Sequence, residues 1–291
     1  MKNNSCRVFA NAKINLHLQV TGKRPDGYHN ISSVMQSVDL CDEILITLNN
    51  SGTVTTFTEN KIIDGENLVT LAAIALLKES GSILGADIVL KKHIPLSAGV
   101  GGGSADAAAV LTALNKMLGE PISKERLFEI ALSLGADVPF CLEGGTQKCE
   151  GLGEVLTNVK LSHSYYVVLV KHHQKRSTGH MYSLIDKNLC GQITTQRVVQ
   201  LLEKGDLCGL KECSVNDFLK VSNDKNEQLE ICNKLYEGGA AFSGLSGSGP
   251  TLFALFERQP EEDFLKSLRE EYKEVYLCKT TNIGCKIADD N

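Results

Sequence analysis

The chain has 291 residues and a formal net charge of −5, and 42% of its residues are hydrophobic. These values are typical of a globular protein with two domains, and they do not indicate binding to nucleic acid or to an anionic membrane. The 10 cysteines are scattered without a Cys-x-x-Cys pair, so a zinc site is not expected. With no signal peptide and no apolar run of about 18 residues, we expect a cytoplasmic protein with reduced thiols.

The first predicted element is a strand over residues 13–20, in which apolar and polar residues alternate. This alternation predicts a half-buried strand. The apolar face is made of Ile14, Leu16, Leu18 and Val20, and the polar face of Lys13, Asn15, His17 and Gln19. Lys13 and Asn15 are therefore neighbours on one face, although a lysine in such a strand is most often a solvated surface group.

A turn-rich connector, TGKRPDGYH, follows at residues 21–29 and ends in Tyr28 and His29. Their rings are suited to contact a flat ligand, but the segment taken alone favours an ordinary hairpin loop. Further along the chain we predict strands at residues 31–40 and 43–48, a helix at 67–79 and a strand at 87–93. The last of these leads into the most informative stretch of the chain.

That stretch is a glycine-rich loop, PLSAGVGGGSA at residues 95–105, with helical periodicity behind it and Gly119 as the stop. Glycine accepts positive φ and has no Cβ, so such a loop can turn its amides toward an anion at a helix N-terminus. We predict Ser104 as the N-cap. A Walker A loop and a dinucleotide fingerprint are both excluded by Ser104 and Ala105. A tight turn that uses glycine only for packing remains the alternative.

In the next segment, Ser123 and Gly135 are predicted to begin and end a helix. Asp137 follows at what Pro139 indicates is a helix-to-strand junction, where it is either a simple cap or turn residue or a carboxylate held at a site. The second half begins with a strand at residues 165–170 and a basic run at 171–176. The remaining predicted elements are helices at 196–202, 217–221, 226–237 and 261–270, and strands at 251–256 and 274–278.

Several separated segments resemble one family, the galactokinase, homoserine kinase, mevalonate kinase and phosphomevalonate kinase (GHMP) superfamily. The loop at 95–105 is similar to its phosphate loop, and SGSGPT at 246–251 to its C-terminal glycine motif. AKINL at 12–16, GKRPDGYH at 22–29 and LGADVPF at 134–140 resemble the branch that phosphorylates 4-diphosphocytidyl-2-C-methyl-D-erythritol. The resemblance covers nearly the full length. Two departures, Asn11 in place of a usual proline and Val100 in place of a usual leucine, alter packing only.

The resemblance implies an α+β, two-domain GHMP kinase fold. An ATP-binding half of the ribosomal-protein-S5-domain-2 type would cover residues 1–160 and a ferredoxin-like half residues 161–291, with the active site between them. It also implies transfer of the γ-phosphoryl group of ATP to the 2-hydroxyl of the cytidine substrate, a step of the non-mevalonate isoprenoid pathway. ATP and Mg²⁺ would be the cofactors. Ser104 is a candidate oxygen ligand of the metal, and the metal ligands as a set remain unknown.

Residue roles follow from the matching motifs. The implied catalytic residues are Lys13 and Asp137. The implied substrate-site residues are Asn15, Tyr28, His29 and, in a segment matched less securely, Tyr182. The implied nucleotide-binding residues are Pro95, Leu96, Ser97, Ala98, Gly99, Val100, Gly101, Gly102, Gly103, Ser104 and Ala105. Lys23, Arg24 and the basic run at 171–176 are expected near the substrate diphosphate.

Two other functions remain as alternatives. One is a different small-molecule GHMP kinase, of the homoserine or mevalonate type, and the other is a non-catalytic nucleotide-binding sensor. The Asp-Gly-Tyr-His segment after Ala-Lys-Ile-Asn favours the cytidine substrate, and the intact Lys13 and Asp137 argue against a sensor. The sequence indicates a small-molecule substrate and neither nucleic acid nor membrane as a partner, and it does not indicate an oligomeric state.

Overall fold

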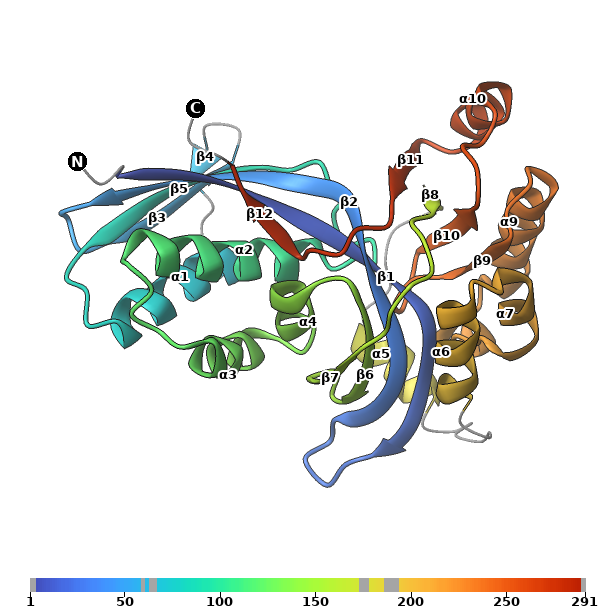
Figure 1. The fold of residues 1–291 in the computed structure, drawn as a ribbon, viewed down its shortest axis with the longest axis horizontal. Coiled ribbons are helices and arrows are strands. Elements are labelled where there is room, and N and C mark those ends of the chain that lie inside the picture. The colour runs from blue at the N-terminus through green and yellow to red at the C-terminus, as the bar shows by residue number, and fades with distance from the viewer. Residues whose placement is uncertain (1–3, 59–60, 63–66, 173–177, 186–193, 289–291) are drawn as a thin grey trace.

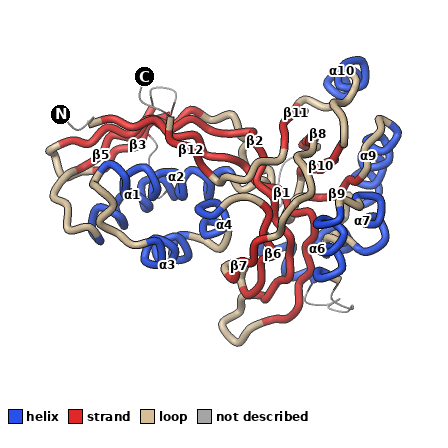
Figure 2. The backbone as a smooth tube through the Cα atoms, in the orientation of Figure 1, coloured by secondary structure: helices blue, strands red, loops and turns tan. Residues whose placement is uncertain are grey.

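A computed structural model describes residues 4–58, 61–62, 67–172, 178–185 and 194–288. In these ranges the chain forms two sheets, one of eight strands and one of four, with helices packed against them. Figures 1 and 2 show that the large sheet and its helices lie on one side of the molecule and the small sheet and its helices on the other. We call the large sheet with its helices the first body and the small sheet with its helices the second body. Strands β1 and β2 of the large sheet extend toward the second body (Figure 1).

The large sheet has the order β12-β1-β2-β5-β3-β4, with β6 and β7 attached through β2. Its strands are β1 (Ser5–Lys23), β2 (His29–Asn49), β3 (Val54–Thr58), β4 (Lys61–Ile62), β5 (Gly85–Lys91), β6 (Thr146–Gly151), β7 (Val155–Asn158) and β12 (Cys285–Ile287). All pairings are antiparallel except that of β3 with β5. The associated helices are α1 (Leu68–Glu79), α2 (Gly102–Met117), α3 (Lys124–Leu134) and α4 (Val138–Glu143). Helices α1 and α2 cover one face of the sheet (Figure 1).

The small sheet has the antiparallel order β11-β8-β10-β9. Its strands are β8 (Tyr166–Lys171), β9 (Phe242–Leu245), β10 (Thr251–Phe256) and β11 (Glu274–Lys279). Its helices are α5 (Thr178–Ile185), α6 (Thr195–Lys204), α7 (Leu207–Cys213), α8 (Asp217–Val221), α9 (Lys225–Glu237) and α10 (Glu262–Glu271). After β11 the chain returns to the large sheet, where β12 pairs with β1.

The prediction of two strands at residues 31–40 and 43–48 was wrong, because β2 runs unbroken from His29 to Asn49. Its first part pairs with β6 and its second part with β5, so each part has its own partner on the same edge. Strand β1 pairs with β2 along nearly its whole length, with register shifts between Asn11 and Lys13 and between Asn15 and His17. Bulges of this kind redirect side chains near functional sites.

The prediction that β1 is half-buried was also wrong. Its apolar face, including Ile14 and Leu16, packs in a core cluster with Leu169 and Phe253 of the small sheet. Its polar residues Lys13, Asn15, His17 and Gln19 are buried as well. Alternation of residue types identifies the two faces of a strand, but it does not show that a second body covers the polar one.

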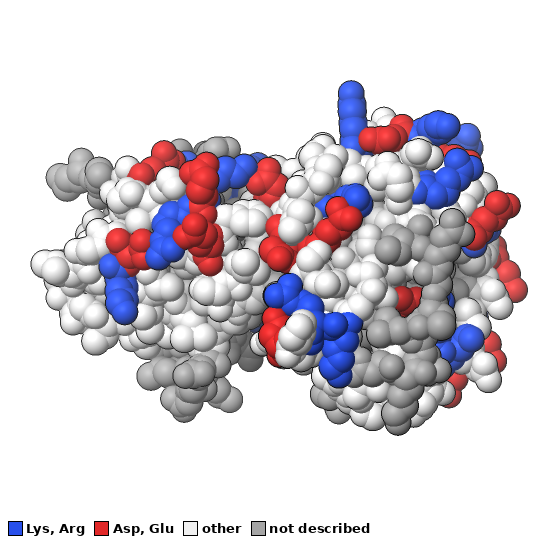
Figure 3. All heavy atoms as spheres, turned by 90° about the horizontal axis from the view of Figure 1, so that it is seen from below, with Lys and Arg blue, Asp and Glu red and all other residues white. Residues whose placement is uncertain are grey.

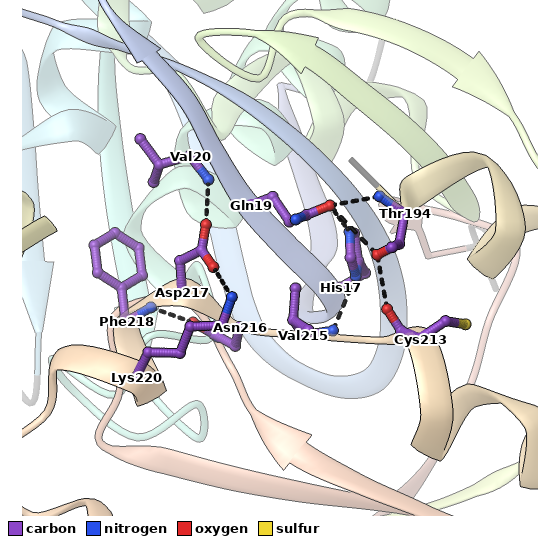
Figure 4. Close-up of polar contacts among 10 residues, drawn as sticks. All are labelled: His17, Gln19, Val20, Thr194, Cys213, Val215, Asn216, Asp217, Phe218 and Lys220. Carbon is purple, nitrogen blue, oxygen red and sulfur yellow. Dashed lines mark hydrogen bonds and ion pairs between the residues drawn. The ribbon is translucent and has the colours of Figure 1, made fainter. Parts of the chain in front are cut away.

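The polar face of β1 is joined to the second body by a network of hydrogen bonds (Figure 4). Val215 N donates to His17 Nδ1 at 3.1 Å, and His17 Nε2 lies 3.1 Å from Gln19 Oε1. Because Nδ1 accepts, the proton of the neutral ring is on Nε2, which donates to Gln19. Burial lowers the pKa of His17 to about 4; the Gln19 bond and Asp217 oppose this shift, and Lys220 adds to it slightly.

This buried histidine predicts an acid-sensitive fold. In the unfolded chain His17 is protonated as the pH falls below about 6.5, whereas in the native protein its ring remains neutral down to about pH 4. The contribution of His17 to the unfolding free energy is therefore complete above pH 6.5 and falls by about 3 kcal/mol as the pH is lowered to 4. In the His17→Asn variant, whose side-chain oxygen can still accept from Val215, we expect a slope smaller by about 1.4 kcal/mol per pH unit in this range. Urea denaturation from pH 4 to 7 measures it, and parallel curves for parent and variant would contradict the assignment.

On the face in Figure 3, acidic and basic side chains are interspersed. The nine described cysteines are free, and Cys190 lies outside the described residues. No helix in the described ranges is long and apolar enough to cross a membrane.

Candidate active site

The glycine loop enters α2 through left-handed backbone. Gly99 has φ +79° and Gly101 has φ +73°, values that glycine adopts without strain. The helix begins at Gly102 with Gly101 as its N-cap, so the prediction of Ser104 as N-cap was wrong, and Ser104 lies in the first turn. The first-turn amides of Gly102, Gly103 and Ser104 have no acceptor within the helix, and this end of α2 is therefore suited to bind an anion.

A second glycine turn, residues 246–249, packs directly against this loop. Ser246 Oγ donates to Gly99 O at 3.0 Å, and Thr251 N donates to Ala98 O at 3.3 Å. A Cβ added to Gly99 would lie 2.6 Å from Ser246 O and 2.7 Å from Gly249 O. The two turns come from different bodies of the protein, so their close approach fixes the geometry between the bodies.

We expect Gly99→Ala to raise the KM for ATP about tenfold or more. The left-handed conformation alone costs a non-glycine residue about 1–2 kcal/mol, and the added methyl group collides with two backbone carbonyls. Gly103→Ala is the matched control in the same loop, because its methyl group would meet only Leu68 Cδ1, at 3.7 Å. Steady-state kinetics at varied ATP measure both variants. Equal KM values for the two would show that the contact between the turns does not matter.

Lys13 and Asp137 form an ion pair beside the loop. Lys13 Nζ lies 3.2 Å from Asp137 Oδ2, with side-chain exposures of 4% and 34%. Lys13 Nζ also donates to Asn15 Oδ1 at 2.8 Å, and Lys13 N donates to Val100 O at 2.9 Å. A Cβ at Gly101 would lie 2.8 Å from Lys13 Cγ, so the loop glycine leaves room for the lysine stem.

Asp137 is the N-cap residue of α4, with Pro139 in the first turn. The prediction of a helix-to-strand junction here was therefore wrong. Proline at the start of a helix has a suitable φ and loses no necessary hydrogen bond, so it marks an entry into helix as readily as an extended segment. The side chain of Asp137 makes no capping bond, and its carboxylate faces Lys13 instead.

Aromatic rings form the other wall of the site. His29 and Tyr182 are stacked with ring centroids 4.6 Å apart and planes at 15°, and Phe218 meets Tyr182 edge-on at 5.0 Å. Burial, with a smaller effect of Asp137, raises the pKa of Tyr182 to about 12, so its hydroxyl group remains protonated at neutral pH. Tyr28 is 65% exposed and lines the same cleft.

A buried cluster of three charged side chains, Lys92, Asp42 and Asp106, joins the start of the glycine loop to the neighbouring elements. Lys92 Nζ pairs with Asp106 at 2.6 Å and with Asp42, and Asp42 Oδ1 accepts from the backbone N–H groups of His93 and Ile94. Burial lowers the pKa of Lys92, but the two carboxylates raise it by more. Burial also raises the pKa of Asp106. The cluster joins β2, the entry to the loop and α2.

These elements enclose a cleft of about 840 Å³. Of the predicted site residues, all but Ala105 line it; Ala105 is buried inside α2. The cleft is also lined by residues not assigned to the site from the sequence, among them Met35, Leu68, Lys92, Leu152, Ser183, Phe218, Gly247 and Ser248. Gly247 and Ser248 had a sequence signal, the glycine motif at 246–251, whereas Phe218 lies in a helix predicted without a role.

The basic residues expected at the diphosphate fall into different places. Lys23 lines the cleft. Arg24 does not line it and pairs with Asp26 at 3.0 Å. Lys171 pairs with Glu274 at 2.7 Å, away from the lining residues, and residues 173–176 of the basic run lie outside the described residues.

The donor set of the cleft suits an ion that arrives bound to phosphate. Among the described residues that line it, Asp137 is the sole acid, and no group of three or more His, Cys, Asp or Glu side chains in the described ranges could hold a metal. Magnesium usually keeps several waters and is held by substrate phosphates with one or two protein oxygens. The Ser104 hydroxyl and the Asp137 carboxylate are oxygen donors of this kind.

Comparisons with known proteins agree with this geometry. The family model described as GHMP kinases N terminal domain matches residues 67–145, and that described as GHMP kinases C terminal matches residues 201–274. The chain is 40% identical over 290 residues to 4-diphosphocytidyl-2-C-methyl-D-erythritol kinase of Thermoanaerobacter pseudethanolicus, covering 97% of this chain and 98% of that one. It is 41% identical over 261 residues to the kinase of the same name from Geobacter metallireducens, covering 88% and 91%.

Solved structures are similar as well. A crystal structure of 4-(cytidine 5'-diphospho)-2C-methyl-D-erythritol kinase matches with a TM-score of 0.79 and 28% identity, covering 94% of this chain and 98% of that one. Homoserine kinase from Cytophaga hutchinsonii matches with a TM-score of 0.73 and 21% identity, covering 99% and 98%. The second likeness concerns the fold alone.

Proposed function

The chain belongs to the GHMP kinase family, and we propose that it is the kinase that phosphorylates the 2-hydroxyl of 4-diphosphocytidyl-2-C-methyl-D-erythritol with ATP, a step of the non-mevalonate isoprenoid pathway. One observation carries the proposal. The glycine loop, the Lys13–Asp137 pair and the stacked rings of His29 and Tyr182 all line a single cleft. Phosphate binding, hydroxyl activation and recognition of a flat base are thus available within one site.

The reaction requires little covalent chemistry from the protein. The amides of Gly102, Gly103 and Ser104 bind the β- and γ-phosphates at the N-terminus of α2. Asp137 orients the acceptor hydroxyl and takes its proton as the oxygen bonds to the γ-phosphorus. The bond from that phosphorus to the β–γ bridging oxygen breaks, and ADP leaves. Lys13 stabilises the negative charge near the acceptor oxygen.

Magnesium supplies charge neutralisation on the phosphates when it is bound with the nucleotide. The Ser104 hydroxyl and the Asp137 carboxylate are the residues of this chain that would hold it. Lys92 stays fixed on its two carboxylates and keeps the loop entry in place.

The cytidine end of the substrate binds at the aromatic wall. His29, Tyr182 and Tyr28 offer ring faces and polar atoms to a pyrimidine, and Lys23 offers charge to the diphosphate. Asn15 contacts the substrate near Lys13. The division at residues 160 and 161 remains part of the proposal and is supported by the two sheets, although β12 returns to the first. The free thiols in the described ranges support a reducing, cytoplasmic site of action.

The test is substrate choice by the purified protein with Mg-ATP. ADP release is measured with the cytidine alcohol and, in parallel, with homoserine, mevalonate and galactose. We expect turnover of the cytidine alcohol alone. Turnover of one of the other alcohols without use of the cytidine compound would favour the sibling-kinase alternative, and no turnover of any would favour a nucleotide sensor.

A further inference from the structure

We propose that Asn216 is a positioning residue for the Lys13–Asp137 pair, acting through Gly247 and Asn15. Asn216 does not line the cleft, and no role was predicted for it from the sequence, where it directly precedes the short helix at 217–221. The inference rests on the proposed kinase function. It concerns how the second body of the protein holds the reacting groups of the first.

Both the oxygen and the nitrogen of the Asn216 side-chain amide form hydrogen bonds. It is 9% exposed, and its Oδ1 accepts from Phe218 N at 2.9 Å as the N-cap of α8. Its Nδ2 donates to Leu245 O at 2.7 Å and to Gly247 O at 2.9 Å. The amide group therefore binds two carbonyls at the start of the second glycine turn.

From Gly247 the chain of contacts continues to the ion pair. Gly247 N donates to Asn15 Oδ1 at 3.0 Å, and the same oxygen accepts from Lys13 Nζ at 2.8 Å. Lys13 Nζ in turn lies 3.2 Å from Asp137 Oδ2. The Asn15 amide group is fixed from its other side as well, because its Nδ2 donates to Ser33 Oγ at 3.0 Å. A shift of Gly247 would thus move the oxygen that holds the Lys13 ammonium.

The segment that carries Asn216 is itself bound to β1, the strand of Lys13 and Asn15 (Figure 4). Ser214 Oγ donates to Leu16 O at 2.5 Å, Leu18 N donates to Val215 O at 2.8 Å, and Val20 N donates to Asp217 Oδ2 at 2.8 Å. Asn216 therefore holds the second glycine turn in a fixed position relative to β1, the strand that carries Lys13. A hydrogen bond between surfaces remote from the ion pair would stabilise the fold without affecting the position of Lys13.

The experiment uses Asn216→Ser in the full chain. Serine keeps an N-cap acceptor for α8 but loses both donors to Leu245 and Gly247. We expect kcat to fall about tenfold, with the KM for ATP and for the alcohol changed less than about threefold, because the shift of Gly247 displaces Lys13 while the bond from Ser246 to Gly99 still joins the two turns. Asp217→Asn is the matched control one residue along. It keeps an acceptor for Val20, and we expect its kcat to remain within about twofold of the parent.

A double-mutant cycle separates positioning from a merely structural role. If Asn216 acts through Lys13, Asn216→Ser has less than a twofold further effect on kcat in a Lys13→Met background. An equal fall in both backgrounds overturns the proposal, as does a kcat of Asn216→Ser within twofold of the parent. Asn216→Asp provides a second variant of the same size, and circular dichroism at the assay temperature verifies that each protein is folded. If one variant unfolds, the other is used for the test. If both Asn216→Ser and Asn216→Asp unfold, Asn216 has a structural role and the proposal is wrong.

Parent turnover is measured first and tests the proposed function by itself. The effect of Asn216 is a ratio of variant to parent for whichever alcohol the parent phosphorylates. A wrong substrate therefore leaves the test of Asn216 intact, and an inert Asn216 leaves the proposed function intact.

Discussion

Asp137→Asn is expected to lower kcat by about 10²–10⁴-fold, the usual range for loss of a general base. The amide keeps the size of the carboxylate but does not accept the proton of the acceptor hydroxyl. Because the proposed phosphate ligands are the amides of the glycine loop, and Asp137 would contribute to nucleotide binding only through the magnesium, the KM for ATP is expected to change less than kcat. ADP release under saturating substrates measures the effect.

The matched control is Asp263→Asn on α10, where the side chain is 94% exposed. It makes the same chemical change far from the lining of the cleft, and we expect no change in kcat. If Asp137→Asn kept more than half of the parent kcat, the carboxylate would have no part in the proton transfer.

Lys13→Met gives the second large effect, an expected fall in kcat of about 10²–10³-fold, comparable with the loss of one preorganised donor to a developing charge. Methionine retains the apolar stem that packs against Gly101 and removes only the ammonium. Asp137 is 34% exposed, so water can solvate it once its partner is lost, and the variant is expected to fold. Lys13→Arg should not restore activity, because a planar guanidinium does not place its charge where the compact ammonium contacts Asn15 Oδ1 and Asp137 Oδ2.

Lys148→Met on β6 is the control for this substitution. Lys148 pairs with Glu150 at 2.8 Å and does not line the cleft. Its loss is expected to leave kcat unchanged. A Lys13→Met enzyme as active as the Lys148→Met enzyme would remove the lysine from the mechanism.

Local features of the fold were predicted well where the sequence has local signals. Ser123 accepts from Arg126 N as the N-cap of α3, and Gly135 ends that helix, both as predicted. The helix at residues 217–221 and the strand at 251–256 were confirmed without change. Helices α5 and α7 were missed, because their residues give only a weak periodic pattern.

Features that depend on distant segments could not be predicted. Lys13 belongs to a regular strand in sequence, and its burial depends on segments far along the chain, because Val100, Gly101 and Asp137 lie against it. Asn216 is linked to Asn15 through Gly247. Asn15 and Gly247 are more than 200 positions apart in the sequence. The family motifs identified Lys13 and Asp137 as a pair, but the chain of hydrogen bonds that holds them has no motif of its own.

The reaction products show whether the purified protein phosphorylates the 2-hydroxyl of the cytidine alcohol. Purified protein, Mg-ATP and 4-diphosphocytidyl-2-C-methyl-D-erythritol are incubated, and the products are examined by ³¹P NMR and mass spectrometry. We expect a new phosphomonoester on the 2-position of the alcohol, with the cytidine diphosphate intact and ADP formed in equal amount. ADP and inorganic phosphate beside unchanged alcohol, or a phosphoryl group on another position, would contradict it.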